Sequence, residues 1–166
     1  ARREIAAGAI GVTVAKTTEA EVYAREGIRD ILIAHCVVGE PKLRRVAELC
    51  RMADPIVCCD HFVQAEALSR VCQSIGVRCR VLIDVNIGMN RTGIRPGPDA
   101  IDLARGILTL PGVRLAGVMG YEGHLLILPD PEEKQRRIAS VMGVLAEARD
   151  QLLALGVGTP IVSAGG

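Results

Sequence analysis

Short apolar runs alternate with longer amphipathic segments along the whole chain. Six runs rich in β-branched residues are continuously apolar, which is typical of strands buried on both faces. They cover residues 9–15, 30–34, 55–59, 80–85, 114–120 and 160–166. The segments between them have helical period and lie at 18–27, 41–52, 61–76, 97–110 and 131–156. Several begin near a proline or end at a glycine, so the pattern predicts strictly alternating strands and helices.

This alternation predicts a parallel sheet covered by helices, and two architectures provide one. A complete doubly wound sheet needs about this length, whereas a closed (β/α)8 barrel takes about 250 residues. Ala1 enters what reads as the middle of a helix, and Gly166 follows a strand with no covering helix after it. We therefore expect an α/β fold, a partial (β/α)8 TIM barrel of about six parallel strands, truncated at both ends. The alternative is a complete, non-enzymatic doubly wound domain.

Composition and charge exclude several classes of protein. The chain is 49% apolar with a mean hydropathy of +0.30, which excludes a disordered segment. Its 20 basic and 19 acidic residues leave a formal charge of +1 without long blocks of either sign. This balance argues against nucleic acid and anionic membranes as partners. No apolar run approaches the roughly 20 residues of a bilayer span, and the N-terminus lacks a signal-peptide pattern, so we expect a soluble, cytoplasmic protein.

The cysteines do not form a pattern that predicts chemistry. The chain has six of them, without paired CxxC spacing: Cys36, Cys50, Cys58, Cys59, Cys72 and Cys79. We expect most of them to be small buried hydrophobes. Adjacent Cys58 and Cys59 on a strand point to opposite faces, which argues against a metal site built from this set.

Ligands of parallel α/β proteins gather beyond the carboxyl ends of the strands, so the residues directly after each apolar run are the candidates for chemistry. They are Lys16, His35 and Cys36, Asp60 and His61, residues 86–91, residues 121–124 and residues 163–166. These polar groups converge on one rim of the predicted sheet. We predict that Tyr121 and His124 stand in a site where the fifth strand ends.

Two of these stretches have chemistry of their own. The small residues of SAGG at 163–166 allow backbone amides to approach an anion such as phosphate, although a tight turn without a ligand has the same composition. The glycine-rich stretch at 84–97 carries Arg91, whose planar donors suit a carboxylate or phenolate oxygen. A structural ion pair between Arg91 and Asp84 is the alternative.

The remaining rim residues have simpler interpretations. A lysine at a strand end is a Schiff-base candidate, but Lys16 is equally explained as a rim charge before a helix. Arg95, before a proline, reads as a solvated helix entry. His61 reads as the opening residue of a helix after Asp60, and a lone rim histidine such as His35 is more often a surface group than a catalyst.

Together these stretches resemble one family. The likeness covers nearly the whole chain and includes DVNIGMNRTGIRPG at 84–97, MGYEGHLL at 119–126 and IVSAGG at 161–166. In order and spacing, the motifs resemble the pyridoxal-phosphate (PLP) enzymes of fold type III with an alanine-racemase-like N-terminal barrel. The branch is that of the low-specificity D-threonine aldolases and D-serine dehydratases.

The resemblance implies that the barrel holds PLP at its carboxyl rim and that a second, β-rich domain follows. The family's Schiff-base lysine lies on the first barrel strand, which would precede Ala1. Its divalent-metal ligands, where present, lie in the C-terminal domain, beyond Gly166. On this basis residues 1–166 are an incomplete PLP-binding barrel without metal ligands, and we expect the chain alone to be inactive.

The resemblance also assigns roles by position. Arg91 looks like the arginine that reaches the phenolate side of the cofactor or the substrate carboxylate. Tyr121 and His124 match the segment that lines the ring and the substrate, and His124 is a candidate for proton transfer with a β-hydroxyl. The start of the phosphate-binding turn is matched by Ser163, Gly165 and Gly166. The catalytic candidates are therefore Arg91, Tyr121 and His124.

The activity that the resemblance implies is cleavage of D-3-hydroxy amino acids to glycine and an aldehyde. D-serine dehydration and amino-acid racemisation on the same barrel are the enzymatic alternatives. A non-catalytic PLP-binding protein of cofactor homeostasis is the alternative of another class. The expected partner is a small-molecule D-amino acid, with no nucleic acid or membrane, and a homodimer is compatible with the family.

Overall fold

The sheet of this protein is parallel throughout, and its strands follow one another in chain order. The computed structural model describes residues 1–158 and 160–165. The strands are β1 (Val12–Val14), β2 (Asp30–Cys36), β3 (Asp54–Cys59), β4 (Cys79–Asp84), β5 (Val113–Met119) and β6 (Ile161–Ser163). Their order in the sheet is β1-β2-β3-β4-β5-β6. A doubly wound sheet reverses its strand order at a switch point, so this order confirms the predicted partial barrel.

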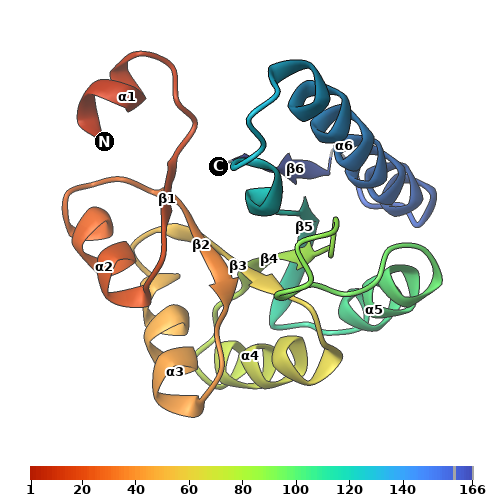
Figure 1. The fold of residues 1–166 in the computed structure, drawn as a ribbon. Helices are drawn as coiled ribbons and strands as arrows, with labels where there is room; N and C mark the ends of the chain where they lie inside the picture. Colours follow the sequence, from red (N-terminus) through yellow and green to blue (C-terminus); the bar gives the residue numbers. More distant parts are fainter. Residues whose placement is uncertain (159, 166) are drawn as a thin grey trace.

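Helices cover the outside of the strands, apart from the short N-terminal helix, which buries none of its residues and stands away from the sheet (Figure 1). They are α1 (Arg2–Ala6), α2 (Thr17–Arg25), α3 (Glu40–Leu49), α4 (Phe62–Ser74), α5 (Pro98–Leu108) and α6 (Pro131–Ala154), and a 3-10 turn, η1 (Gly123–Leu125), follows β5. The segments expected from helical period are confirmed, whereas the turn η1 was not predicted. Helix α6 begins where the Asp130 carboxylate accepts a hydrogen bond from the Glu132 amide at 2.9 Å. Among the described residues, no helix combines the length and the apolarity needed to cross a bilayer.

The sheet is apolar on both faces, as the continuous apolar runs predict. Its outer face packs against the helices in a large cluster that includes Ile31, Val81 and Val118. Its inner face forms a smaller cluster of five buried residues: Ile56, Cys58, Leu82, Ala116 and Met119. Cys58 belongs to the inner cluster and Cys59 to the outer one, so the adjacent thiols do point to opposite faces. Burial of each large apolar side chain stabilises the fold by about 1.5–3 kcal/mol.

The sheet curves until its two outermost strands approach the same space. β1 and β6 are not paired with each other, yet Val12 and Val162 line one cavity of about 190 Å³. The approach of β6 to β5 depends on Gly117, which has a φ of +150°. A Cβ at this position would collide with the backbone of Ile161, so only glycine allows this pairing.

A buried arginine joins three strands near their amino ends. Arg80 on β4 is 8% exposed and lies on the inner face of the sheet. Its guanidinium is 2.7 Å from the Asp30 carboxylate on β2 and 2.9 Å from the Asp54 carboxylate on β3, and it also donates to the Asp54 carbonyl. Both aspartates are half exposed, so water offsets part of the cost of burying the charges.

Replacing Arg80 by methionine should lower the free energy of unfolding by about 1–2 kcal/mol, because two carboxylates lose a charged hydrogen-bond donor. Arg114 pairs with Arg80 in the strand register but is exposed and has no ion pair among the described residues. Arg114→Met should therefore change stability by no more than roughly 0.5 kcal/mol. Urea denaturation of the two variants measures both values, and equal losses would contradict this account of Arg80.

Candidate active site at the carboxyl ends of the strands

A cavity of about 310 Å³ opens at the carboxyl ends of the strands. Its wall is built from β1, β2, β5, β6 and the loops that follow β4, β5 and β6. Four residues predicted from the sequence line it together: Arg91, Tyr121, Ser163 and Gly165. Gly166, the other residue of the predicted turn, lies outside the described residues. Arg91 is 30 positions from Tyr121 and 74 from Gly165 in the chain, yet these residues share one mouth of the barrel.

The loop after β4 is folded by its own asparagine. The Asn86 side chain accepts hydrogen bonds from the amides of Gly88 (3.0 Å) and Asn90 (3.2 Å). The loop returns to the sheet where the Asn86 amide donates to the Ile94 carbonyl at 2.9 Å. Arg91 lies on the outward part of this loop, which explains why its side chain is exposed and reaches the cavity.

Arg91 lies over the ring of Tyr121, with 5.3 Å between the guanidinium carbon and the ring centroid. This distance is within the range of a cation–π interaction, which orients both side chains at the mouth. The alternative interpretation of Arg91 was an ion pair with Asp84. The described residues contain no such pair. The donors of Arg91 that do not face the ring remain available to an anionic ligand.

A tight turn fixes Tyr121. A Cβ at Gly123 would collide with the Tyr121 ring, so this glycine allows the ring to fold back over the backbone. Glu122 between them is buried, and its carboxylate accepts a hydrogen bond from the Gly165 amide at 3.2 Å. Glu122 is one of the rim residues 121–124, but no pattern in the sequence predicts that a glutamate in a polar loop is buried.

His124 does not line the cavity. A Cβ at Gly88 would be 3.0 Å from its Nε2 atom, so one edge of the imidazole packs against the loop that carries Arg91. The Nδ1 atom is buried and has no hydrogen-bond partner in the part of the chain that the structure describes. Neither nitrogen opens on the mouth, and the catalytic role of His124 stays a prediction.

Three other rim residues lie as their simpler interpretations expect, whereas His35 is half-buried and lines a cavity together with Arg91 and Tyr121. The His61 side chain accepts from the Val63 amide at 3.2 Å and caps α4. Arg95 is exposed and pairs with Asp99 at 2.8 Å. Lys16 is exposed at the start of α2, where the Glu19 carboxylate accepts its amide hydrogen at 3.2 Å, and it does not line the 310 Å³ cavity.

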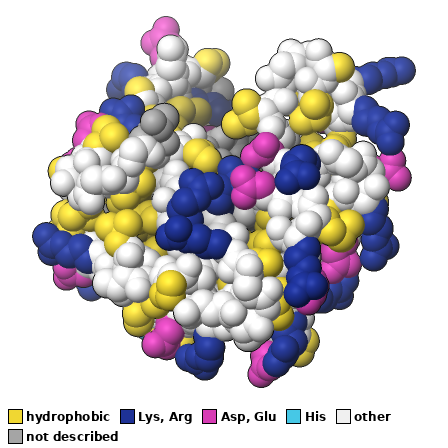
Figure 2. Space-filling model, turned by 180° about the vertical axis from the view of Figure 1, so that it is seen from behind, with side chains coloured by type: hydrophobic (Ala, Val, Ile, Leu, Met, Phe, Trp, Pro, Cys, Tyr) yellow, Lys and Arg dark blue, Asp and Glu magenta, His cyan; other side chains and the backbone are white. Residues whose placement is uncertain are grey.

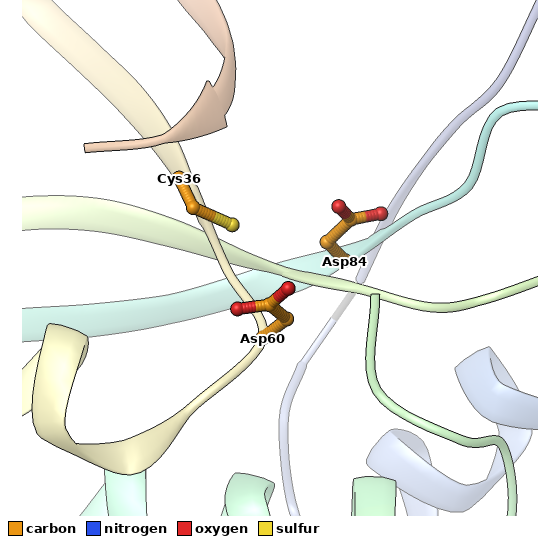
Figure 3. Close-up of side chains that lie close together, drawn as sticks. All are labelled: Cys36, Asp60 and Asp84. Atoms are coloured by element: carbon orange, nitrogen blue, oxygen red, sulfur yellow. The ribbon is translucent and has the colours of Figure 1, made fainter. Parts of the chain in front are cut away.

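The side chains of Cys36, Asp60 and Asp84 lie close together near the carboxyl ends of the strands, as Figure 3 shows. One side-chain atom from each of Cys36, Asp60 and Asp84 lies within 4.8 Å of the others. The oxygens of Asp60 accept from Gln64 Nε2 (2.9 Å) and from the Gly93 amide (3.0 Å). Thiolate and carboxylate groups are ligand types of divalent metals, so this set adds a metal-ligand combination that the sequence analysis did not predict.

The alternation of side chains along the strands could have predicted the position of the two carboxylates in this cluster. Cys58 and Leu82 belong to the inner face, and Asp60 and Asp84 lie two positions further along the same strands. Since strand side chains alternate, both carboxylates continue the inward row. Burial raises the pKa of Asp84, with a further contribution from the Asp60 charge, and Thr92 and Arg91 act in the opposite direction. Burial, together with Asp60 and Asp84, also raises the pKa of the Cys36 thiol.

The fold and the site define a class of protein: a parallel α/β barrel whose polar groups converge on a cavity at the carboxyl rim, the usual place of catalysis in such barrels. The chain belongs to the family described as alanine racemase, N-terminal domain, whose model matches residues 1–166.

The chain is similar to D-threonine aldolase of an Arthrobacter species, with 30% identity over 166 residues. That match covers 100% of this chain and 44% of the relative. The crystal structure of D-threonine aldolase from Filomicrobium marinum superposes with a TM-score of 0.95 at 36% identity, over 99% of this chain and 45% of that one. D-threo-3-hydroxyaspartate dehydratase from Delftia sp. HT23 superposes with a TM-score of 0.85 at 29% identity, over 96% and 42%. The chain thus spans less than half the length of these relatives.

The raised pKa of Asp84 predicts a pH-dependent effect of Asp84→Asn. An ionised Asp84 is disfavoured in the folded state, so its contribution to stability is fully present below the unfolded pKa of about 3.9 and is lost as pH rises through the folded pKa. Asp84→Asn should therefore gain stability relative to the wild type as the pH rises from about 4 to 7.

Urea denaturation across this pH range measures the difference. Asp102→Asn, at an exposed position of α5, is the matched control and should stay within roughly 0.5 kcal/mol of the wild type at each pH. A stability difference for Asp84→Asn that is constant with pH would contradict the effect assigned to burial.

Proposed function

We propose that the full-length protein is a PLP-dependent lyase of the D-threonine aldolase type, which cleaves D-3-hydroxy amino acids to glycine and an aldehyde. The observation that carries the proposal is the shared cavity of Arg91, Tyr121, Ser163 and Gly165. The similarity of nearly the whole chain to two D-threonine aldolases supports the proposal.

The cavity fits the cofactor in size and in chemistry. Its volume of about 310 Å³ is within the range of about 300–1,000 Å³ typical of small-molecule sites. Residues 163–165, the end of β6 and the turn after it, combine the half-buried Ser163 with two exposed small residues, and nothing lies within 4 Å of a Cβ built on Gly165. A phosphate group can approach such a backbone closely. We therefore assign the phosphate end of PLP to this turn.

Arg91 and Tyr121 would hold the ring and the substrate. The guanidinium donates hydrogen bonds and positive charge to the phenolate oxygen of the cofactor or to the substrate carboxylate. The Tyr121 ring fixes the position of that guanidinium and provides an apolar wall that excludes water from one side of the mouth. The bound cofactor supplies an electron sink for the cleavage of a bond at the α-carbon.

We assign His124 to proton transfer with the β-hydroxyl of the substrate, because an imidazole exchanges protons near neutral pH. Since its Nε2 atom faces Gly88 and Nδ1 is buried, this role requires the loop after β4 to shift. Among the described residues the buried Nδ1 atom has no hydrogen-bond partner.

The remaining parts of the proposed enzyme lie outside residues 1–166. The chain covers 44% of the Arthrobacter relative, which leaves room for a Schiff-base lysine on a further strand and for a C-terminal β domain. A divalent metal, where the reaction uses one, would bind in that second domain. We also propose a cytoplasmic location, which is supported by the six free thiols, four of them buried.

Dehydration is the second candidate, because the chain also superposes on D-threo-3-hydroxyaspartate dehydratase with a TM-score of 0.85. Incubation of the full-length protein with PLP and D-threonine separates the reactions. Glycine and acetaldehyde are the expected products. Formation of 2-oxobutanoate and ammonia would show that the reaction is dehydration and not aldol cleavage. PLP binding without turnover of any D-amino acid would favour a cofactor-homeostasis protein.

Arg91→Met should lower kcat/KM for D-threonine about 10- to 100-fold, which corresponds to the loss of a charged hydrogen bond. Arg95→Met is the matched control, because Arg95 is in the same loop but pairs with Asp99 at the surface. Steady-state kinetics of both variants test the assignment. Loss of activity in Arg95→Met with normal activity in Arg91→Met would exchange the roles of the two arginines.

A further inference from the structure

The turn at residues 163–165 is tied to the rest of the mouth by a buried carboxylate. Glu122 is 5% exposed, and its Oε2 atom accepts the amide hydrogen of Gly165 across 43 positions of the chain. The backbone of Glu122 is itself fixed, since its carbonyl accepts from the Leu125 amide at 2.8 Å in the turn η1. The carboxylate therefore extends from a rigid support.

Little else holds the turn. The strand register between β5 and β6 ends at the pair of Met119 and Ser163, where the Gly120 amide donates to the Ser163 carbonyl at 3.1 Å. Beyond that pair, Glu122 makes the one side-chain hydrogen bond to the turn among the described residues. Gly165 has a φ of +115°. A glycine that nothing restrains can adopt many other backbone conformations.

We infer that Glu122 is a positioning residue, whose carboxylate sets the place of the turn at residues 163–165 and so determines the affinity of the mouth for a phosphate monoester. The inference rests on the proposed function, which assigns the phosphate of PLP to this turn. A carboxylate does not attract a phosphate, so the contribution of Glu122 is the geometry of its acceptor and not its charge. A neutral acceptor of the same length should replace it.

The test compares the binding of PLP and of unphosphorylated pyridoxal to the full-length apoprotein by absorbance titration. Glu122→Gln keeps an acceptor at the same distance and should leave the preference for the phosphorylated cofactor within about twofold of the wild type. Glu122→Ala removes the acceptor and Glu122→Asp withdraws it by one methylene. Both should reduce the preference about tenfold while the affinity for pyridoxal stays unchanged.

Glu132→Ala, at an exposed position of α6, is the control and should behave as the wild type. An unchanged preference in Glu122→Ala, or normal binding in Glu122→Asp with a loss in Glu122→Gln, would overturn the inference while the proposed function stands. A wild type that binds PLP and pyridoxal equally would overturn the phosphate site itself, and the role of Glu122 with it. Glu122→Gln and Glu122→Asp decide the matter even where Glu122→Ala does not fold.

Discussion

Parallel pairing of the strands in chain order is the constraint on which the rest of the structure depends. Each strand must return to the same end of the sheet before the next begins, so all six carboxyl ends lie at one rim. The curvature of the sheet then turns this rim into a mouth, with β1 and β6 bordering the same cavities. This geometry brings together residues that are far apart in the chain, and it does not depend on contacts between their side chains. On the face in Figure 2, basic and acidic side chains are interspersed.

The hydrogen bonds between strands end where the strands end, and beyond this point side-chain carboxylates hold two of the loops in place. Asp60 accepts the Gly93 amide at the end of the loop that carries Arg91, and Glu122 accepts the Gly165 amide in the terminal turn. Gly93 also packs against the backbone of Asn86, whereas nothing lies within 4 Å of a Cβ built on Gly165, so the hydrogen bond to a carboxylate matters most for the terminal turn. A site supported in this way is organised before its ligand arrives, which reduces the entropy lost on binding.

The sequence predicted the strands, the helices and the shared mouth, because burial on both faces and helical period leave strong patterns in the chain. Arg91 and Tyr121 were found because they lie in the loops that follow β4 and β5. The proximity of Asp60 and Asp84 could have been predicted by extending the period of two along their strands, whereas the contact of Glu122 could not, since its partner Gly165 lies 43 positions away. For His124 the unpredicted 3-10 turn decides the direction of the side chain, and a strand-based argument therefore placed it in the cavity.

The central claim is that the arginine, the tyrosine and the terminal turn enclose one PLP molecule. A crystal structure of the full-length protein grown with PLP tests it most directly. The account predicts the phosphate against residues 163–165, with the ring bordered by Tyr121 and Arg91 at distances of about 3–4 Å. A cofactor bound elsewhere, or one whose phosphate points away from this turn, would contradict the account.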